Sequence, residues 1–144
     1  MARYSTTVQS NKSREEAFAY LANFANAAEW DPGVVSGEVL SGEPLGLGTT
    51  FRLMCRYFGR QFPLEYRIIA FEAPSKVKFE ANRGSISSVD EIRFVTVSEG
   101  TAVTYDANLH LSGFLGRLMD PLVALAFQRI GGKAAAGLRR ELNA

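Results

Sequence analysis

The 144-residue sequence contains a single cysteine, a single histidine and a single tryptophan. Cys55 has no second cysteine with which to pair, so no internal disulfide can form and nothing indicates an oxidising compartment. His110 alternates with Leu109 and Leu111, which places it on the polar face of a predicted strand. We therefore expect Cys55 to be a small core residue and His110 to be a surface residue, not a catalytic base.

Long apolar runs are also missing. The longest, residues 114–127, is interrupted by Arg117 and Asp120 and is too short to span a bilayer. The first twelve residues, MARYSTTVQSNK, hold no apolar core of the kind that a secretion signal needs. We expect a cytoplasmic protein without stable membrane insertion.

Neither sign of charge is in clear excess, because the sequence contains 16 Lys and Arg residues and 15 Asp and Glu residues. The basic residues are scattered singly along the chain, apart from Arg139 and Arg140. A nucleic-acid-binding surface needs a clustered basic patch or stripe. The sequence therefore predicts no nucleic-acid partner.

Motifs for metals, cofactors and phosphates are absent as well. One histidine, one cysteine and no carboxylate-rich motif at ligand spacing predict neither a metal site nor a cofactor. The glycine-rich segment GEPLGLG at residues 42–48 lacks the Lys and Ser or Thr of a phosphate-binding loop. We interpret this segment as a turn.

What the sequence does contain is a strand, two short helices and then a long β region. Residues 3–10 alternate as a strand, and Ser13 with Glu16 forms a capping box that begins a helix. A second short helix over residues 24–30 ends at the helix-breaking segment Asp31-Pro32-Gly33.

Six further strands are predicted at residues 34–40, 49–58, 62–71, 76–82, 86–97 and 101–111. Short hairpin-type turns join them, so the sheet is predicted to be antiparallel.

The last thirty residues return to a helical pattern. Asp120 and Pro121 suit the start of a helix, although residues 114–119 can extend it upstream with a kink at the proline. Glycines at 131 and 132 cost about 1 kcal/mol each relative to alanine, so we expect a close approach of this helix to the sheet. The long helix is predicted to lie in the concave face of a curved seven-stranded sheet, with space for a cavity between them. Residues 1–144 are thus expected to form one α+β domain.

Four segments resemble a known superfamily: NAAEWDPGV at 26–34, FGRQFPLEY at 58–66, GTAVTYDANLHL at 100–111 and MDPLVALAFQRIGGKAAAGLRREL at 119–142. They are similar to the helix-grip (SRPBCC) proteins, which include START lipid-transfer domains, birch-pollen-allergen-like proteins and polyketide cyclases/dehydrases. The resemblance extends over nearly the whole chain and is greatest to the small polyketide-cyclase/dehydrase-like branch. It implies the helix-grip fold, which serves binding proteins, transporters and enzymes alike.

Polar residues on the predicted concave face are the candidates for chemistry. By alternation, Tyr66, Asp90 and Tyr105 point inward, with Ser88 on the same face as Asp90. A desolvated Asp90 beside the Tyr105 phenol could exchange protons with a ligand, but the tyrosines can equally be structural and a bulge would turn Asp90 to solvent. By the same alternation, the opposite face carries Arg52, Arg56 and Arg67. We can therefore place no cation on the inner face to stabilise a developing oxyanion.

Three functional hypotheses follow. The first is a binding protein for a lipid, polyketide-like or other flat apolar molecule, with Trp30 beside the cavity mouth. The second is an aromatase/cyclase or dehydratase that uses Asp90 and Tyr105 as acid–base groups. The third is an interaction module, monomeric or homodimeric, that packs the small residues 131–137 against another chain. The predicted ligand-binding residues are Trp30, Phe51, Leu53, Tyr66, Ile68, Phe79, Asp90, Ile92, Phe94, Tyr105, Leu118, Leu122, Ala126 and Ile130.

Overall fold

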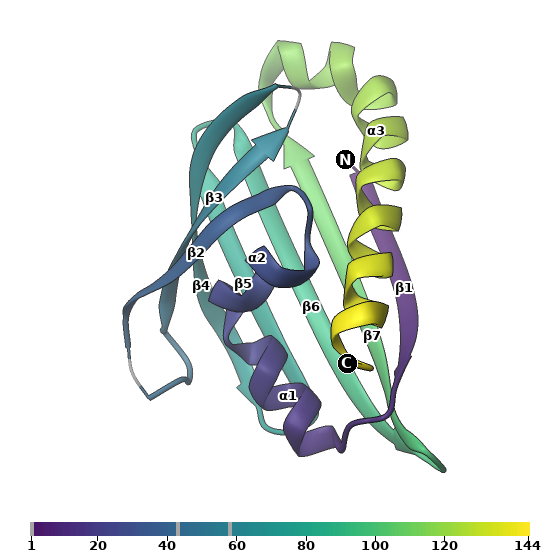
Figure 1. The fold of residues 1–144 in the computed structure, drawn as a ribbon. Helices are drawn as coiled ribbons and strands as arrows, with labels where there is room; N and C mark the ends of the chain where they lie inside the picture. The colour runs from purple at the N-terminus through teal and green to yellow at the C-terminus, as the bar shows by residue number, and fades with distance from the viewer. Residues whose placement is uncertain (1, 43, 58) are drawn as a thin grey trace.

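Seven antiparallel strands form one curved sheet in the order β1-β7-β6-β5-β4-β3-β2 (Figure 1). The computed structural model describes the backbone of residues 2–42, 44–57 and 59–144, and their side chains except those of residues 2, 57, 111 and 113–124. The strands are β1 (Ala2–Ser10), β2 (Val34–Ser41), β3 (Thr50–Tyr57), β4 (Arg60–Glu72), β5 (Lys76–Arg83), β6 (Ile86–Val97) and β7 (Gly100–Leu111). The predicted α+β class and the antiparallel sheet are confirmed.

Two short helical segments follow β1, as predicted. Helix α1 (Arg14–Ala22) begins at Ser13, whose Oγ accepts the backbone N–H of Glu16 at 3.1 Å and donates to its carboxylate at 3.2 Å. The predicted second helix is a 3₁₀ turn, η1 (Phe24–Asn26), that continues into α2 (Ala27–Trp30). It ends where expected, because Asp31 leaves the helical conformation one residue before Pro32.

The C-terminal helix α3 spans Gly113–Glu141, so it starts upstream of Asp120 and includes Pro121. The upstream extension considered from the sequence is therefore the arrangement found. Proline removes one backbone hydrogen bond of a helix and bends it. The first turns of α3 lie at an angle to the rest of the helix (Figure 1).

The concave face of the sheet is covered by two separate elements (Figure 1). The α1–η1 segment covers one part. There Phe18 packs edge-on against Phe94, with ring centroids 5.2 Å apart, and Phe24 stacks on Phe79, with ring centroids 4.0 Å apart. Helix α3 covers another part, beside β1 and α2. A cavity remains between the sheet and these helices.

Two glycines let α3 approach its neighbours. A Cβ atom on Gly131 would overlap the ring of Tyr4 in β1, and one on Gly137 would overlap the carbonyl of Trp30 in α2. The expected close approach to the sheet therefore holds at Gly131, whereas Gly137 packs on a helix. Gly132 faces open space. Since Gly131 and Gly137 are occupied within the chain, this segment gives little support to the interaction-module hypothesis.

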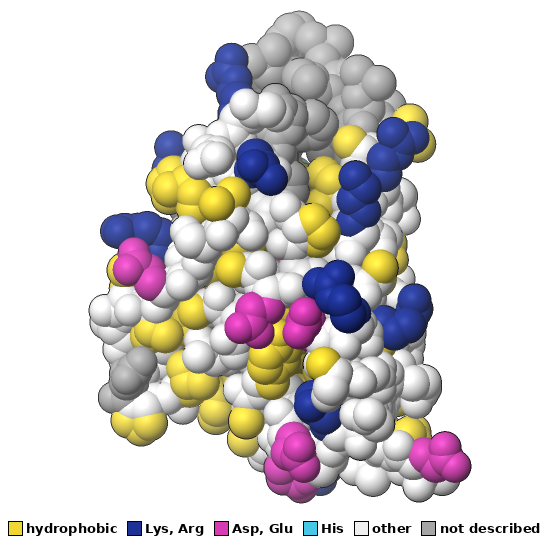
Figure 2. All heavy atoms as spheres, in the orientation of Figure 1, with side chains coloured by type: hydrophobic (Ala, Val, Ile, Leu, Met, Phe, Trp, Pro, Cys, Tyr) yellow, Lys and Arg dark blue, Asp and Glu magenta, His cyan; other side chains and the backbone are white. Residues whose placement is uncertain are grey.

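The outer surface carries the charged groups. Arg52, Arg56, Arg67 and His110 are all exposed, as alternation predicts. Lys and Arg side chains lie in several places on the visible face and form no continuous stripe (Figure 2). Among the described residues, no helix is both long and apolar enough to cross a membrane.

Candidate functional site

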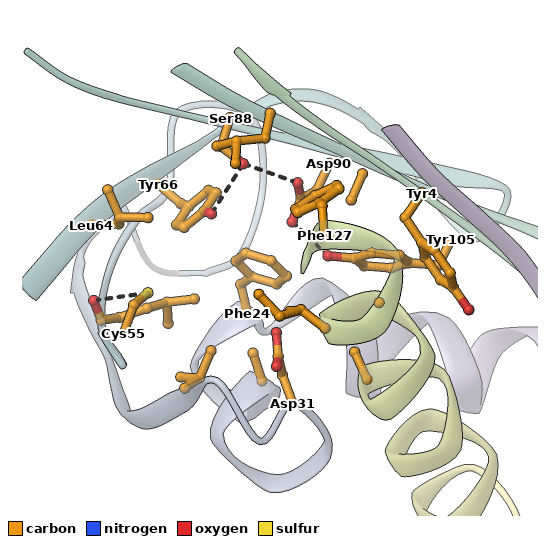
Figure 3. A pocket seen from close by; sticks show the side chains of 18 of the residues that line it. Tyr4, Phe24, Asp31, Cys55, Leu64, Tyr66, Ser88, Asp90, Tyr105 and Phe127 are labelled. Atoms are coloured by element: carbon orange, nitrogen blue, oxygen red, sulfur yellow. Dashed lines mark hydrogen bonds between the residues drawn. The ribbon is translucent and has the colours of Figure 1, made fainter. Parts of the chain in front are cut away.

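A cavity of about 300 Å³ lies between the concave face of the sheet and the helices (Figure 3). Its walls are mostly apolar and come from β1, β2, β3, β4, β6, β7, η1, α2, α3 and the turn between α2 and β2. The described residues that line it are Tyr4, Phe24, Ala27, Asp31, Val34, Leu53, Cys55, Phe62, Leu64, Tyr66, Ile86, Ser88, Asp90, Tyr105, Ala107, Leu109, Phe127, Ile130, Gly131 and Ala134.

A row of hydrogen-bonded polar side chains crosses the sheet side of this cavity (Figure 3). Tyr105 Oη donates to Asp90 Oδ2 at 2.6 Å, and Ser88 Oγ donates to Asp90 Oδ1 at 3.3 Å. Tyr66 Oη donates to Ser88 Oγ at 3.3 Å. All four side chains are buried. Three strands, β4, β6 and β7, therefore contribute to one polar row in an otherwise apolar wall.

Strand register explains why these side chains meet. Asp90 lies opposite Ala107 on β7, whose small side chain leaves room beside the carboxyl group. Tyr105 is two residues from Ala107 on the same face, so its long side chain reaches Asp90 diagonally. Ser88 and Asp90 are two residues apart and point the same way. The β6–β7 register contains no bulge here, so Asp90 stays inward.

The carboxyl group of Asp90 is held in surroundings that disfavour its charge. Burial raises its pKa to about 7, against the opposing effect of the hydrogen bond from Tyr105. The carboxyl group of Asp31 raises it further. Burial and the neighbouring Asp90 likewise raise the pKa of the Tyr105 phenol well above its usual value. Near neutral pH, Asp90 can therefore accept or release a proton while Tyr105 remains protonated.

A second carboxyl group, that of Asp31, lines the cavity from the turn between α2 and β2. Its Oδ1 accepts the backbone N–H of Gly33 at 2.9 Å, which holds the side chain over the Asp-Pro-Gly turn. Burial raises the pKa of Asp31 to about 6, and the hydrogen bond from Gly33 opposes that shift. From the sequence, Asp31 is predicted only to end a helix, so this part of the site was not predicted.

The sequence as a whole matches one protein family. A family model described as polyketide cyclase / dehydrase and lipid transport matches residues 1–143. The chain belongs to this family. No curated protein sequence matches the chain.

Solved structures share the family's fold with this chain. The protein TTHA0849 from Thermus thermophilus is 18% identical with a TM-score of 0.78, over 98% of this chain and 95% of that one. A START superfamily protein from Mycobacterium smegmatis is 13% identical with a TM-score of 0.78, over 99% and 97%. The Zhui aromatase/cyclase from a Streptomyces species is 14% identical with a TM-score of 0.74, over 97% and 92%. At such identities the likeness shows the fold alone, and it is the helix-grip fold of the START neighbour.

In this family member, the residues predicted as ligand contacts divide into groups. Those that line the cavity are Leu53, Tyr66, Asp90, Tyr105 and Ile130. Those that are buried in the core but are not among the described lining residues are Phe51, Ile68, Phe79, Ile92 and Phe94. In the second group, Phe94 and Phe79 are covered by α1 and η1 instead of facing the cavity. Phe18 of α1 packs against Phe94, and Phe24 of η1 stacks on Phe79. From the sequence, the whole concave face is expected to line the cavity, whereas η1 and α1 occupy part of that face.

The remaining predicted contacts come from helices. Trp30 is 1% exposed and is not among the described lining residues; its ring lies 5.5 Å from that of Tyr105, behind the cavity wall. Ala126 is half-buried and also outside this set. Leu118 and Leu122 lie outside the residues whose side chains the structure describes.

Several lining residues were not predicted, and some had a usable signal. Cys55, Leu64, Ala107 and Leu109 share strand parity with predicted inward residues, so alternation alone would have found them. Cys55 is buried as expected, and burial raises the pKa of its thiol to about 12, which makes it unreactive. Phe24 and Asp31 have no such signal, because they sit in irregular segments whose direction only the tertiary structure fixes.

Proposed function

We propose that the protein binds one hydrophobic small molecule, with a volume of about 300 Å³ or less, in the cavity between the sheet and α3. The observation that carries this proposal is the combination of mostly apolar walls with a few polar groups, namely the hydrogen-bonded row on the sheet side and Asp31 on the helix side. Ligand sites combine these two features, since apolar walls supply affinity and a few polar groups fix orientation. The family description, which includes lipid transport, agrees with this use of the fold.

The energetics of the cavity support the same conclusion. Protein interiors are normally close-packed, and an unfilled space deprives its lining atoms of contacts. Here α3 is already in close contact with the ring of Tyr4 at Gly131 and with the backbone of Trp30 at Gly137, and these contacts oppose its movement into the space. A ligand that fills the space restores those contacts at about 25 cal/mol per Å² of apolar surface that it buries.

The test uses N-phenyl-1-naphthylamine, a neutral aromatic probe whose fluorescence rises in apolar surroundings. Ala134 lines the cavity from α3, so Ala134→Phe should fill it with a phenyl ring. Ala136 lies on the same helix but is exposed, so Ala136→Phe adds the same ring outside the cavity. We expect saturable 1:1 binding to the wild type and to Ala136→Phe, and at least tenfold weaker binding to Ala134→Phe.

Two results would count against the proposal. One is the absence of saturable binding to the wild-type protein. The other is equal binding to Ala134→Phe and Ala136→Phe, which would place the probe on the surface. Circular dichroism of both variants checks that the added ring has not unfolded the chain.

A second candidate function rests on Asp90 and Tyr105. A carboxyl group with a pKa of about 7, hydrogen-bonded to a phenol inside a cavity, has the properties of a general acid–base pair. The family description includes cyclases and dehydrases, which need such a pair. Against it, no Lys, Arg or His is among the described lining residues, so an enolate would lack a stabilising cation. Binding is therefore the preferred function.

Cyclisation of a synthetic poly-β-ketone thioester, followed by mass spectrometry, separates the two functions. If the protein is an enzyme, it should consume the thioester faster than buffer does, and Asp90→Asn should abolish the difference. No acceleration by the wild type would leave binding as the function.

A further inference from the structure

Two carboxyl groups face the same apolar cavity from opposite sides (Figure 3). Asp90 projects from β6 on the sheet side, and Asp31 projects from the turn after α2 on the helix side. They are close enough for Asp31 to raise the pKa of Asp90 by its charge. The two groups therefore bracket whatever molecule occupies the space.

The two carboxyl groups differ in how many hydrogen-bond donors they already have. Both carboxyl oxygens of Asp90 accept a hydrogen bond, one from Ser88 and one from Tyr105. Asp31 accepts Gly33 N–H at Oδ1, and among the described residues no donor reaches its Oδ2. Asp31 is also more acidic, with a pKa of about 6, so it is mostly ionised at pH 7. The open acceptor in the cavity is thus a carboxylate oxygen that carries charge.

Nothing in the described part of the chain neutralises this charge. The ion pairs that the structure shows join Arg3, Arg52, Lys76, Arg93 and Arg140 to acidic groups other than Asp31 and Asp90. The described lining residues include no Lys, Arg or His. A carboxylate in apolar surroundings without a cationic partner is costly, and a cationic donor offsets that cost better than a neutral one.

We propose that the cavity takes a hydrophobic amine, whose protonated nitrogen donates to Asp31 Oδ2 while its apolar body lies against the aromatic and aliphatic walls. This inference rests on the proposed function of the cavity and names the class of ligand. A ligand with a hydroxyl group satisfies the acceptor but leaves the charge in place. A ligand with a carboxylate, such as a fatty acid, adds a third acidic group and is disfavoured.

The test compares three compounds that share one apolar body and differ in the head group: 2-(2-naphthyl)ethylamine, 2-(2-naphthyl)ethanol and 2-naphthylacetic acid. Isothermal titration calorimetry at pH 7 gives their dissociation constants with the wild-type protein. We expect the amine to bind at least tenfold more tightly than the alcohol, and the acid to bind most weakly. This comparison needs no variant, so it does not depend on how a mutant folds.

Asp31→Asn then tests the assignment of the charge. Asparagine keeps an Oδ1 that can accept Gly33 N–H, so the turn should persist while the negative charge is lost. The amine should lose at least tenfold in affinity, whereas the alcohol should change less than threefold. Glu99→Gln removes one negative charge from an exposed turn and should leave all three affinities as they are.

The outcomes separate this inference from the proposed function. If N-phenyl-1-naphthylamine and the three compounds all fail to bind, the proposed function is wrong and the inference falls with it. If the neutral probe binds but the amine binds no better than the alcohol or the acid, the cavity is a binding site and the amine assignment is wrong. An amine preference that survives Asp31→Asn unchanged would likewise overturn the role of Asp31.

Discussion

At the scale of single residues, the molecule places two ionisable groups where their charges are disfavoured. Asp90 and Asp31 both face an apolar cavity, and burial raises the pKa of each, to about 7 and about 6. Groups with such shifts lower the stability of a fold when they ionise. In return, the two carboxyl groups provide polar contacts for a ligand inside an otherwise apolar cavity.

The first prediction concerns the pH dependence of stability. The pKa of Asp90 is higher in the folded state than in the unfolded state, so the folded state binds its proton more tightly. The free energy of unfolding should therefore fall as the pH rises from about 4 to about 7. Asp90→Asn does not titrate and should be about 2 kcal/mol more stable than wild type at pH 8, but no more stable at pH 4. Urea denaturation at both pH values measures the difference.

Asp106 provides a control with the opposite sign. Its hydrogen bond and ion pair with Arg3, at 2.7 Å, lower the pKa of Asp106. It therefore stabilises the fold at neutral pH, and this contribution is lost as the pH falls through its folded-state pKa. Asp106→Asn should be less stable than wild type at pH 8. If Asp90→Asn behaved in the same way, the carboxyl group of Asp90 would be a stabilising anion and our description of the cavity would be wrong.

A second prediction concerns Tyr105. Its hydroxyl group donates to Asp90 at 2.6 Å, and this bond is the largest effect that lowers the pKa of Asp90. Tyr105→Phe should raise that pKa above about 7 and cost about 1–3 kcal/mol of stability at pH 8. A ¹³C NMR titration of the Asp90 carboxyl carbon measures the pKa. Tyr66→Phe, which removes a bond to Ser88 instead, should shift it less; an equal shift would contradict the assigned roles.

Sequence patterns predicted the strand residues of the site but not Asp31. Strand alternation placed Asp90, Tyr66 and Tyr105 inward, because side-chain direction in a strand follows directly from position. Asp31 follows a short helix and begins a turn, where no periodicity fixes the direction of a side chain. Periodicity therefore found the sheet side of the cavity and Ile130 of α3, and it missed Asp31.

At the scale of elements, the position of α3 depends on two glycines. Gly131 lies against the ring of Tyr4, and Gly137 lies against the carbonyl of Trp30. Strand bounds were predicted to within a few residues, since turns and alternation mark them. The start of α3 was predicted less well, because a proline inside a helix resembles a proline at its first turn.

The third prediction compares glycines of this helix. Gly137→Ala would place a Cβ atom onto the backbone of α2, which cannot move aside as a side chain can, so it should destabilise the protein by about 2 kcal/mol or more. Gly132→Ala meets no atom within 4 Å and should stabilise it by up to about 1 kcal/mol through helix propensity. Thermal denaturation of both variants gives the comparison. Equal tolerance of the two alanines would show that α3 is not held against α2.

At the scale of the whole molecule, the cavity results from how the concave face is shared. Phe18 and Phe24 fill one part of that face, and α3 is held at a fixed distance above another. The order of elements predicted the sheet and its covering helix. It could not predict which part of the face stays uncovered, because that depends on where η1 turns inward.

According to the proposed function, this uncovered space holds a hydrophobic small molecule. Native mass spectrometry of the protein purified from its own host detects such a molecule, and Ala134→Phe and Ala136→Phe are prepared in the same way for comparison. We expect one small molecule bound per chain in the wild type and in Ala136→Phe, and its loss in Ala134→Phe. Wild-type protein that carries no ligand, together with a crystal structure in which the interior is packed solid, would contradict it.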